Sequence, residues 1–583
     1  MTRKRQKIQS FLEEDESKGN NRDPNWPWDL LLKDIKVIKD SLDKKDIWVN
    51  KVEIGIINSV NFQRLREIRQ LPFVDFVYPG ATHTRFDHSL GTLHMTKLIV
   101  DNINNNSDRW QNCESLDSRE IFISRIVGLI HDMAHLSYSH ILEDGKLCSK
   151  KQWEDNDRIE KYLGEKSDIY QIIQKNIKEA FEECNENNWE EAFKEVIEDI
   201  KHTLKVIEGE KGSKSRELIF ADIVGNTICA DILDYIPRDL SYTGLPGQYD
   251  DRILSYFVAK RLNDKRRAVI RLFKGDGYRD SVLSSIMEIL ELRYNLAAKV
   301  YYHHTRRKAV AMAVEMVAAA CKAGIVNKTH LLELGGISLR DYILGIDESK
   351  INEEEKIKSL RMAKKLANHI KNRWLYEKLC DIEKVATEAR GLIEEMQNDW
   401  EKRYKNERKM EELFELEPGS ILIYAPSKFM SAKKTLETLV EVPVEIAGDV
   451  NVKSLEELKE NDFREENKDN YKVLNMNKEI LITKHKLLWK LSVFVHKDIS
   501  EKTRIQIKNL CNQWFKGMAP VTAVEALAES LGITIEPTVC TEIAEGINDT
   551  VASHPSKTFF IAALDVAKSR LEEYSGKDEK GSK

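Results

Sequence analysis

The stretch IFISRIVGLIHDMAHLSYSH, from Ile121 to His140, is the part of the sequence that decides the fold. Apolar residues recur every three or four positions up to Ile130, which predicts a buried helix. The apolar run ends at His131 and Asp132. Burying such groups is costly unless they are paired or used, and an imidazole nitrogen and a carboxylate oxygen can both bind a divalent cation. The helix end is therefore a candidate metal site.

More ligand-capable residues follow this doublet at close range. His135 stands one helical turn after His131 on the same face, and His140 completes the cluster. A lone histidine on an apolar helix is more often a hydrogen-bonded core residue, and an isolated His-Asp pair carries little information. His131, Asp132, His135 and His140 within ten residues indicate a shared site instead.

Two distant segments can complete a metal site. TRFDHSLG contains His88, and ADILDYIPRD begins with Ala230 and Asp231. His88 and Asp231, together with His131 and Asp132, would form a set of two histidines and two carboxylates. Such a set suits Mn, Fe, Mg or Zn and leaves coordination positions open for water and phosphate.

The three segments together resemble the HD-domain deoxynucleoside triphosphate triphosphohydrolases, most closely the branch of SAM-and-HD-domain dNTPases. FQRLREIRQLPFVDFVYPGATHTRFDHSLGTLH is similar to the first block of that family, HDMAHLSYSH to the second and DILDYIPRDLSYTG to the third. A weaker likeness runs through LRYNLAAKVYYHH and WKLSVFVHKDISEKTRIQIKNLCNQWF, so that it covers much of Ile47 to Phe515, with a divergent gap from Lys150 to Lys214. No separate SAM domain is visible.

The resemblance implies roles for residues that match the family's motif positions. The implied metal ligands are His88, His131, Asp132 and Asp231. The ion, which could also be Co, would polarise the α-phosphate and activate a water molecule. The implied catalytic residues are His135 and Asp132. His135 would protonate the departing 5′ oxygen, because an imidazole titrates near neutral pH.

The resemblance also implies a nucleotide-binding slot. The implied phosphate contacts are Arg85, His140 and Arg293. Tyr235, Asp239 and Gln70 would hold the sugar at its 3′ hydroxyl, and Leu71 and Tyr301 would crowd the 2′ position and favour deoxyribose. The alternative for Tyr301 is ordinary packing of an aromatic ring beside a helix. The implied products are a deoxynucleoside and intact inorganic triphosphate.

Three departures from the family pattern bear on specificity and regulation. Ile232 replaces a phosphate-binding lysine, and Trp153-Glu154 stands roughly where relatives have a His-Glu pair. Gln63 and Arg66 match a regulatory guanine-nucleotide site, but Asn58 replaces its acidic residue. A nucleotide effector is expected on this resemblance, and its identity stays open.

The rest of the chain predicts a mainly α protein, with an HD-domain helical body and a smaller C-terminal α+β lobe. The 583 residues are 41% hydrophobic and 32% charged, which excludes a disordered chain. The strand candidates are ILIYAPS, VEVPVEI and LLWKLSVFV. The expected units are a flexible tail at 1–27, an HD body at 28–400 with a charged helical insertion at about 150–214, a regulatory or oligomerisation lobe at 401–574, and a flexible tail at 575–583.

Charge and cysteine usage set the expected partners and compartment. The 91 basic and 97 acidic residues give a net charge of -6, which disfavours nucleic acid as a partner. No apolar segment could span a membrane, and the eight cysteines contain no C-x-x-C pair, so a cytoplasmic protein is expected. The expected partners are a dNTP substrate, a nucleotide effector and further copies of the chain, in a tetramer or hexamer.

Two other functions compete with dNTP hydrolysis. An HD metal site could instead cleave a phosphodiester, in a cyclic dinucleotide or a single-stranded nucleic acid. A catalytically silent nucleotide sensor is the third hypothesis. The complete ligand set argues against the sensor, because an unused buried cluster of charge would be unfavourable.

Overall fold

A computed structural model describes the fold. The described residues run from 26 to 516, with gaps at 41, 43–45, 111, 140, 143–154, 209–216, 263–264, 275–276, 384–392, 394–395, 398, 427–442, 446–451, 455–458 and 463–467, and include residue 538. The predicted tail at 575–583 lies outside them, as does the predicted tail at 1–27 apart from Trp26 and Pro27, which begin helix α2.

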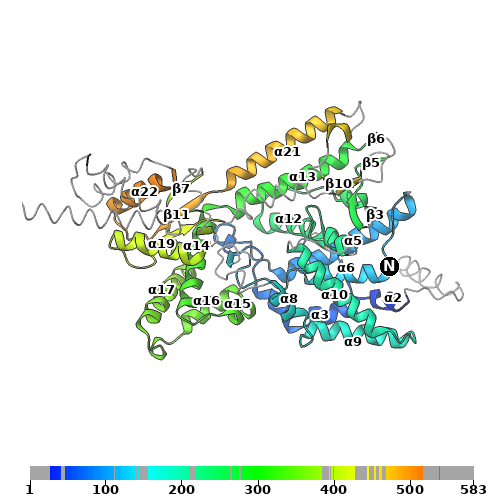
Figure 1. The fold of residues 1–583 in the computed structure, drawn as a ribbon, viewed down its shortest axis with the longest axis horizontal. Coiled ribbons are helices and arrows are strands. Elements are labelled where there is room, and N and C mark those ends of the chain that lie inside the picture. Colours follow the sequence, from blue (N-terminus) through cyan, green and yellow to red (C-terminus); the bar gives the residue numbers. More distant parts are fainter. Residues whose placement is uncertain are drawn as a thin grey trace, which may run out of the picture.

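Helices dominate the described residues, which confirms the mainly α prediction (Figure 1). The α-helices are α2 (Trp26–Leu32), α3 (Lys51–Ile57), α4 (Val60–Gln63), α5 (Arg85–Arg109), α6 (Ser118–Ile130), α8 (Asp155–Leu163), α9 (Asp168–Glu183), α10 (Trp189–Ile207), α11 (Glu217–Gly225), α12 (Ala230–Thr243), α13 (Asp280–Leu296), α14 (His304–Lys322), α15 (Lys328–Glu333), α16 (Gly336–Gly345), α17 (Glu354–Lys371), α19 (Trp400–Leu413), α21 (Lys468–Leu488) and α22 (Glu501–Lys516). Short 3-10 turns are η1 (Arg64–Glu67), η2 (Val74–Phe76), η3 (Asp251–Tyr256), η5 (Glu348–Lys350) and η6 (Glu460–Asp462), and η4 (Ala297–Tyr301) is a π-helical turn.

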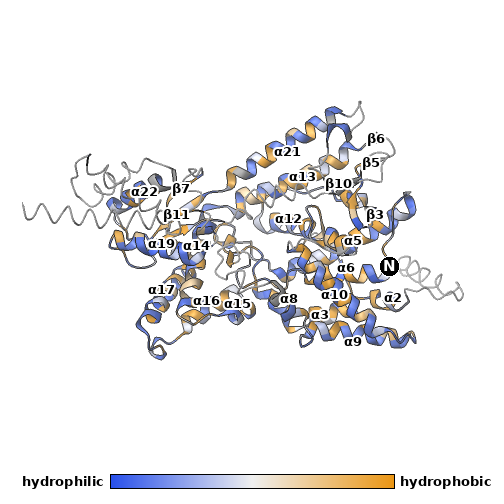
Figure 2. Ribbon diagram, viewed as in Figure 1, coloured by the Kyte–Doolittle hydropathy of each residue, from blue (hydrophilic) through white to orange (hydrophobic). Residues whose placement is uncertain are grey.

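The charged stretch between Lys150 and Lys214 is helical where the structure describes it, in α8, α9 and α10. Hydrophobic and hydrophilic positions alternate along α9 and α10 (Figure 2), so that each helix buries one face and exposes the other. The segment TRIQIKNLCNQWF, whose apolar periodicity is typical of a helix, forms α22, and the similar segment VTAVEALAESLG lies outside the described residues.

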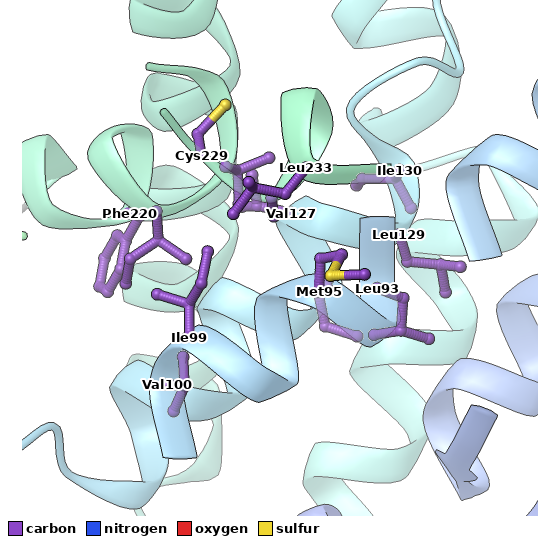
Figure 3. Packing of buried hydrophobic residues seen from close by; sticks show 14 of the residues in the cluster. Leu93, Met95, Ile99, Val100, Val127, Leu129, Ile130, Phe220, Cys229 and Leu233 are labelled. Carbon is purple, nitrogen blue, oxygen red and sulfur yellow. The ribbon is translucent and has the colours of Figure 1, made fainter. Parts of the chain in front are cut away.

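The centre of the body is built from α5, α6, α11 and α12. Both α5 and α6 begin with a capping box: Asp87 accepts a hydrogen bond from the Thr84 backbone N–H at 2.8 Å, and Asp117 and Glu120 bond reciprocally. Apolar side chains of all four helices meet between them (Figure 3), and each large one contributes about 1.5–3 kcal/mol on burial. This packing holds the ends of three helices in fixed register.

The strands form small antiparallel or mixed sheets. The strands are β1 (Asp34–Lys39), β2 (Asp46–Asn50), β3 (Phe257–Leu262), β4 (Lys265–Ile270), β5 (Phe273–Lys274), β6 (Gly277–Tyr278), β7 (Glu377–Ile382), β8 (Ile421–Tyr424), β9 (Pro443–Glu445), β10 (Val452–Ser454) and β11 (Leu491–Val495). Their orders are β1-β2, β10-β9-β4-β3, β7-β11-β8 and β5-β6. The three predicted strand segments contain β8, β9 and β11.

Two of these sheets pair strands from either side of residue 400. β7 pairs with β11, and β9 pairs in parallel with β4 at Ile270 and Val444. Helix α21 also runs alongside α13 (Figure 1). The predicted domain boundary at 400 stays a prediction, but the chain after it packs on the chain before it.

The edge strand β8 is sealed by carboxylates of α19. Glu411 accepts hydrogen bonds from the N–H groups of Ile421 at 2.8 Å and Gly419 at 3.2 Å, and Glu407 accepts from Ile423 at 2.6 Å. An edge strand otherwise presents unpaired N–H groups that can pair with another chain. This seal fixes α19 against the sheet.

Candidate active site

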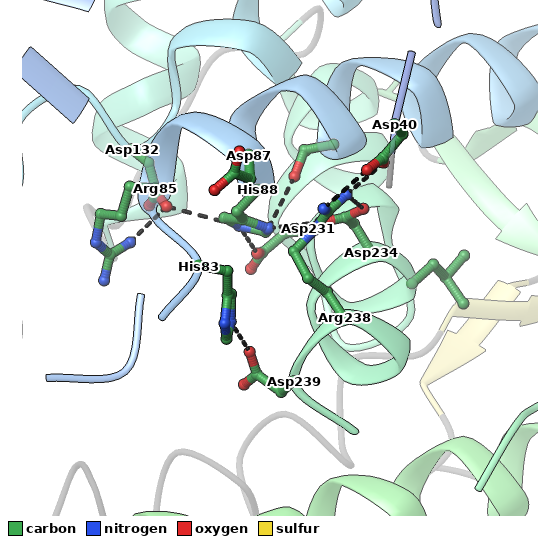
Figure 4. A network of polar contacts seen from close by, with 12 residues as sticks. Asp40, His83, Arg85, Asp87, His88, Asp132, Asp231, Asp234, Arg238 and Asp239 are labelled. Carbon is green, nitrogen blue, oxygen red and sulfur yellow. Dashed lines mark hydrogen bonds and ion pairs between the residues drawn. The ribbon is translucent and has the colours of Figure 1, made fainter. Parts of the chain in front are cut away.

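The ends of three helices bring four ligand-capable side chains to one place, and Figure 4 shows His88, Asp132 and Asp231 among them. His88 lies in the first turns of α5, His131 caps the C-terminal end of α6 and is followed by Asp132, and Asp231 lies in the first turn of α12. The helix predicted to end at the His-Asp doublet therefore ends there. His88 and His131 stand edge to face, with ring centroids 5.2 Å apart.

The distances define a compact cluster. His88 Nε2 lies 2.9 Å from Asp231 Oδ1 and 3.6 Å from Asp132 Oδ2. His131 Nε2 lies 3.6 Å from Asp132 Oδ1 and 3.8 Å from Asp231 Oδ1. One ligand atom from each of His88, His131 and Asp132 lies within 4.8 Å of the others. The structure thus brings together all four side chains predicted as metal ligands.

The orientation of the two imidazoles fits a metal ion. His131 Nδ1 is 2.9 Å from the Gly128 carbonyl, and its buried Nε2 has no hydrogen-bond partner among the described residues. His88 Nδ1 is 2.8 Å from Asp234 Oδ2, and its Nε2 faces the two carboxylates. When one ring nitrogen donates to an oxygen, the other keeps a lone pair for a metal. Both Nε2 atoms point into the same cluster.

Opposite charges within the cluster shift the pKa values of its residues. Burial alone would raise the pKa of Asp132, but Arg85, His131 and His135 lower it well below its usual range. Burial alone would lower the pKa of His88, but hydrogen bonds with Asp231 and Asp234 raise it to about 10. The carboxylates stay ionised, as metal ligands must be.

His135 and Arg85 lie beside Asp132. His135 Nε2 is 3.0 Å from Asp132 Oδ1, and Arg85 pairs with Asp132 Oδ2 while its Nε donates to Ser139 Oγ at 2.8 Å. The structure therefore joins the predicted catalytic histidine and a predicted phosphate contact to the cluster. Arg64 holds the loop that follows α6 and carries Asp132 and His135. Its Nη2 donates to the carbonyls of Met133 at 2.8 Å and His135 at 2.9 Å.

Asp239, one of the residues predicted to hold the sugar, contacts two side chains. Tyr301 donates to Asp239 Oδ2 at 2.6 Å, and His83 Nε2 lies 2.7 Å from Asp239 Oδ1. The buried Oε1 of Gln70 has no hydrogen-bond partner among the described residues. Burial raises the pKa of the Tyr235 hydroxyl above its usual range, and the positive charge of Arg293 opposes that shift.

Two of the remaining predicted positions are buried, and the others lie outside the described residues. Leu71 is buried, and Ile232 is buried in the core, so no lysine-like contact arises from position 232. His140 and Trp153-Glu154 lie outside the described residues.

The three predicted effector residues lie on one short segment that runs from the end of α3 through α4 into η1. Asn58 is the C-cap of α3, Gln63 Nε2 donates to the Ile57 carbonyl at 2.6 Å, and Arg66 Nε donates to Gln63 Oε1 at 2.8 Å. The Arg66 guanidinium stacks 3.5 Å from the ring centre of Phe86, which is the neighbour of Arg85. This segment therefore abuts the active site.

Sequence reasoning missed His83, Asp234 and Arg238. His83 belongs to the quoted block GATHTRFDH, but nothing in its spacing separates it from a core histidine. Asp234 and Arg238 are spaced four residues apart, a detectable helical ion pair, yet their contact with His88 depends on how α12 packs against α5.

This helical fold carries a His–His–Asp group that could hold a metal ion at the junction of three helices, and the chain is similar to HD-domain and dNTPase-like proteins. No family model matches the chain.

Its relatives come from several kingdoms of life. The chain is 28% identical to an uncharacterized protein of Methanocaldococcus jannaschii, over 55% of this chain and 57% of that one. It is 27% identical to the deoxynucleoside triphosphate triphosphohydrolase SAMHD1 homolog of Dictyostelium discoideum, over 59% and 60%, and 28% identical to SAMHD1 of Mus musculus, over 43% and 39%. The chain thus spans less than two thirds of these relatives.

No helix among the described residues is long and apolar enough to cross a membrane.

Proposed function

We propose that the protein is a metal-dependent dNTP triphosphohydrolase that releases a deoxynucleoside and inorganic triphosphate. The observation that carries the proposal is the approach of His88 Nε2 to Asp231 at 2.9 Å and to Asp132 at 3.6 Å, with His131 Nε2 at 3.8 Å and 3.6 Å from the same two carboxylates. Two imidazoles and two carboxylates from distant segments suit a divalent cation with open positions. The SAMHD1 relatives support the choice of substrate.

His88, His131, Asp132 and Asp231 would hold the ion, which is one of Mn, Fe, Mg, Co or Zn. A bound divalent cation supplies Lewis acidity toward a phosphoryl oxygen and makes hydroxide available from water near neutral pH. His135, whose Nε2 lies 3.0 Å from Asp132 Oδ1, would give a proton to the leaving 5′ oxygen. Arg85 would contact phosphate oxygens through its guanidinium fork, because that geometry suits them.

The substrate slot would lie on the side of the cluster that carries Asp239. We assign the 3′ hydroxyl to Asp239, Tyr235 and Gln70, and the exclusion of a 2′ hydroxyl to Leu71 and Tyr301. Tyr301 is tied to Asp239 at 2.6 Å, so its ring is held rather than free to rotate away. Arg293 and His140 complete the proposed phosphate contacts.

Product analysis tests this function. The purified protein is incubated with each dNTP and Mn²⁺, Mg²⁺ or Co²⁺, and the products are separated by ion-exchange HPLC. Deoxynucleoside together with inorganic triphosphate supports the proposal. Nucleoside monophosphates from dNTPs, or cleavage of a cyclic dinucleotide or a single-stranded nucleic acid with no action on dNTPs, would establish an HD phosphodiesterase instead. Binding of dNTP without any product would establish a nucleotide sensor.

We also propose that a nucleotide activates the protein and that its copies associate with one another. In this proposal the protein is cytoplasmic, limits dNTP pools and thereby acts in antiviral or anti-phage defence. The proposed effector contacts are Asn58, Gln63 and Arg66, because Arg66 stacks on Phe86 beside Arg85 and so connects this segment to the active site. Assays with pairs of nucleotides test activation, and light scattering with and without nucleotide tests for a tetramer or hexamer. Rates that are independent of a second nucleotide would remove the effector from the proposal.

A further inference from the structure

His88 is the start of a chain of buried polar contacts that leads away from the cluster (Figure 4). Its Nδ1 lies 2.8 Å from Asp234 Oδ2. Both groups are nearly inaccessible, with side-chain exposures of 1% and 2%. A buried carboxylate beside an imidazole fixes both the ring orientation and the nitrogen that carries the proton.

Arg238 holds that carboxylate on its other side. Its Nε donates to Asp234 Oδ2 at 2.9 Å and its Nη2 donates to Asp234 Oδ1 at 2.8 Å, so both carboxylate oxygens are engaged. The Arg238 side chain is fully buried. A buried guanidinium needs more than one carboxylate oxygen to offset its loss of hydration.

Asp40 supplies the outer anchor. Its carboxylate accepts from Arg238 Nη2 at 2.7 Å and Nη1 at 3.2 Å. Asp40 follows β1, far in sequence from both α5 and α12. The chain Asp40–Arg238–Asp234–His88 therefore connects three separate segments and ends on one imidazole.

Gly91 makes this arrangement possible. It lies one turn after His88 on α5, and a Cβ at that position would come within 1.8 Å of Asp234 Oδ1 and 2.4 Å of Arg238 Nη2. Only glycine leaves room for the carboxylate and the guanidinium against α5. The close approach of the two helices is thus built around this pair.

We propose that Asp234, Arg238 and Asp40 are positioning residues that set the orientation and tautomer of His88 for metal binding. The inference rests on the metal centre of the proposed function, but not on the identity of the substrate. Removing such an outer partner of a ligating histidine costs about 10-fold to 100-fold in metal affinity. We expect about a 10-fold loss for Arg238→Lys, which keeps the charge but loses the two-pronged contact, and a larger loss for Asp234→Asn.

The chain offers a matched control in Arg125. This residue is also buried, and it also bridges two carboxylates, since it donates to Glu53 at 2.6 Å and 2.8 Å and to Asp34 at 2.9 Å. Asp34 lies on β1, near Asp40 in sequence, but the hydrogen bonds of Arg125 go to Glu53, Asp34 and the Trp48 carbonyl and not to His88. Arg125→Lys therefore imposes a similar structural loss without touching the chain of contacts that ends on His88.

The test measures Mn²⁺ binding by isothermal titration calorimetry, with the melting temperature recorded for each full-length variant. Arg238→Lys and the milder Asp40→Asn should weaken Mn²⁺ binding, whereas Arg125→Lys should lower the melting temperature and leave Mn²⁺ affinity within about twofold of the original. If Arg238→Lys does not fold, Asp40→Asn decides alone.

Unchanged Mn²⁺ affinity in Asp40→Asn and Arg238→Lys, or an equal loss in Arg125→Lys, would overturn the positioning role. A wild-type protein that binds no Mn²⁺ would overturn it together with the metal centre. Intact Mn²⁺ binding without dNTP turnover would instead refute only the proposed substrate.

Discussion

The Tyr301 hydroxyl donates a hydrogen bond to Asp239 Oδ2 over 2.6 Å, so a residue of the π-helical turn η4 is tied to a carboxylate on α12. Tyr301→Phe keeps the ring and removes this bond, which is worth about 0.5–1.5 kcal/mol or more for a charged acceptor. If Asp239 binds the sugar, KM for dNTP should rise about fivefold with a smaller change in kcat.

Steady-state kinetics check this prediction, with Tyr342→Phe as the control. The Tyr342 hydroxyl donates only to the Ile325 carbonyl at 3.5 Å, away from the cluster. Equal changes in both variants would argue that Tyr301 serves packing alone.

Substitutions in the metal cluster should separate ligands from the proton donor. His131→Ala or Asp231→Ala should abolish turnover with loss of bound metal, because each removes an atom that faces the shared cluster. His135→Ala should keep the metal and reduce kcat by about 100-fold to 10,000-fold, the usual contribution of general acid catalysis. Metal content by mass spectrometry beside kcat makes the distinction, and equal metal loss in all three variants would make His135 a ligand.

Arg64→Met should loosen the loop that carries Asp132 and His135. The substitution removes two hydrogen bonds from a cationic donor to the Met133 and His135 carbonyls, each worth about 1.5–3 kcal/mol. We expect a lower melting temperature and a loss in kcat that exceeds the change in KM. A variant with a lower melting temperature and normal kcat would show that the loop keeps its geometry without Arg64.

The pH dependence of stability should carry a contribution from His485 on α21. Burial, followed by the positive charge of Arg293, lowers the pKa of His485 to about 4. The unfolded chain therefore takes up this proton first, near the ordinary value of 6.5, so folding stability present above that pH is lost as the pH falls toward 4. His485→Gln should flatten the decline in melting temperature between pH 6.5 and 4.

An unchanged slope in His485→Gln would mean that other groups cause the decline.

Much of the candidate metal cluster could be predicted because its residues belong to short, recognisable sequence patterns. His131 and Asp132 end an apolar helix, and His88 and Asp231 lie in polar positions of helical segments. The mainly α fold follows from apolar periodicity, and the strand candidates at β8 and β11 follow from runs of β-branched and aromatic residues. These properties belong to residues close in sequence, where helix geometry and composition act directly.

Only the tertiary structure determined which side chains and strands these residues and segments contact. The sequence does not say that Asp234 faces His88, that Arg238 reaches Asp40, that His83 meets Asp239, or that β7 pairs with β11. Each contact joins segments that are far apart in the chain, and it forms only when the helices pack and the strands align in one particular way. The local sequence of each segment is compatible with many such arrangements, so it does not determine the contact. Local sequence patterns therefore indicated the candidate metal ligands, while the packing of α5 against α12 determined which residues contact them.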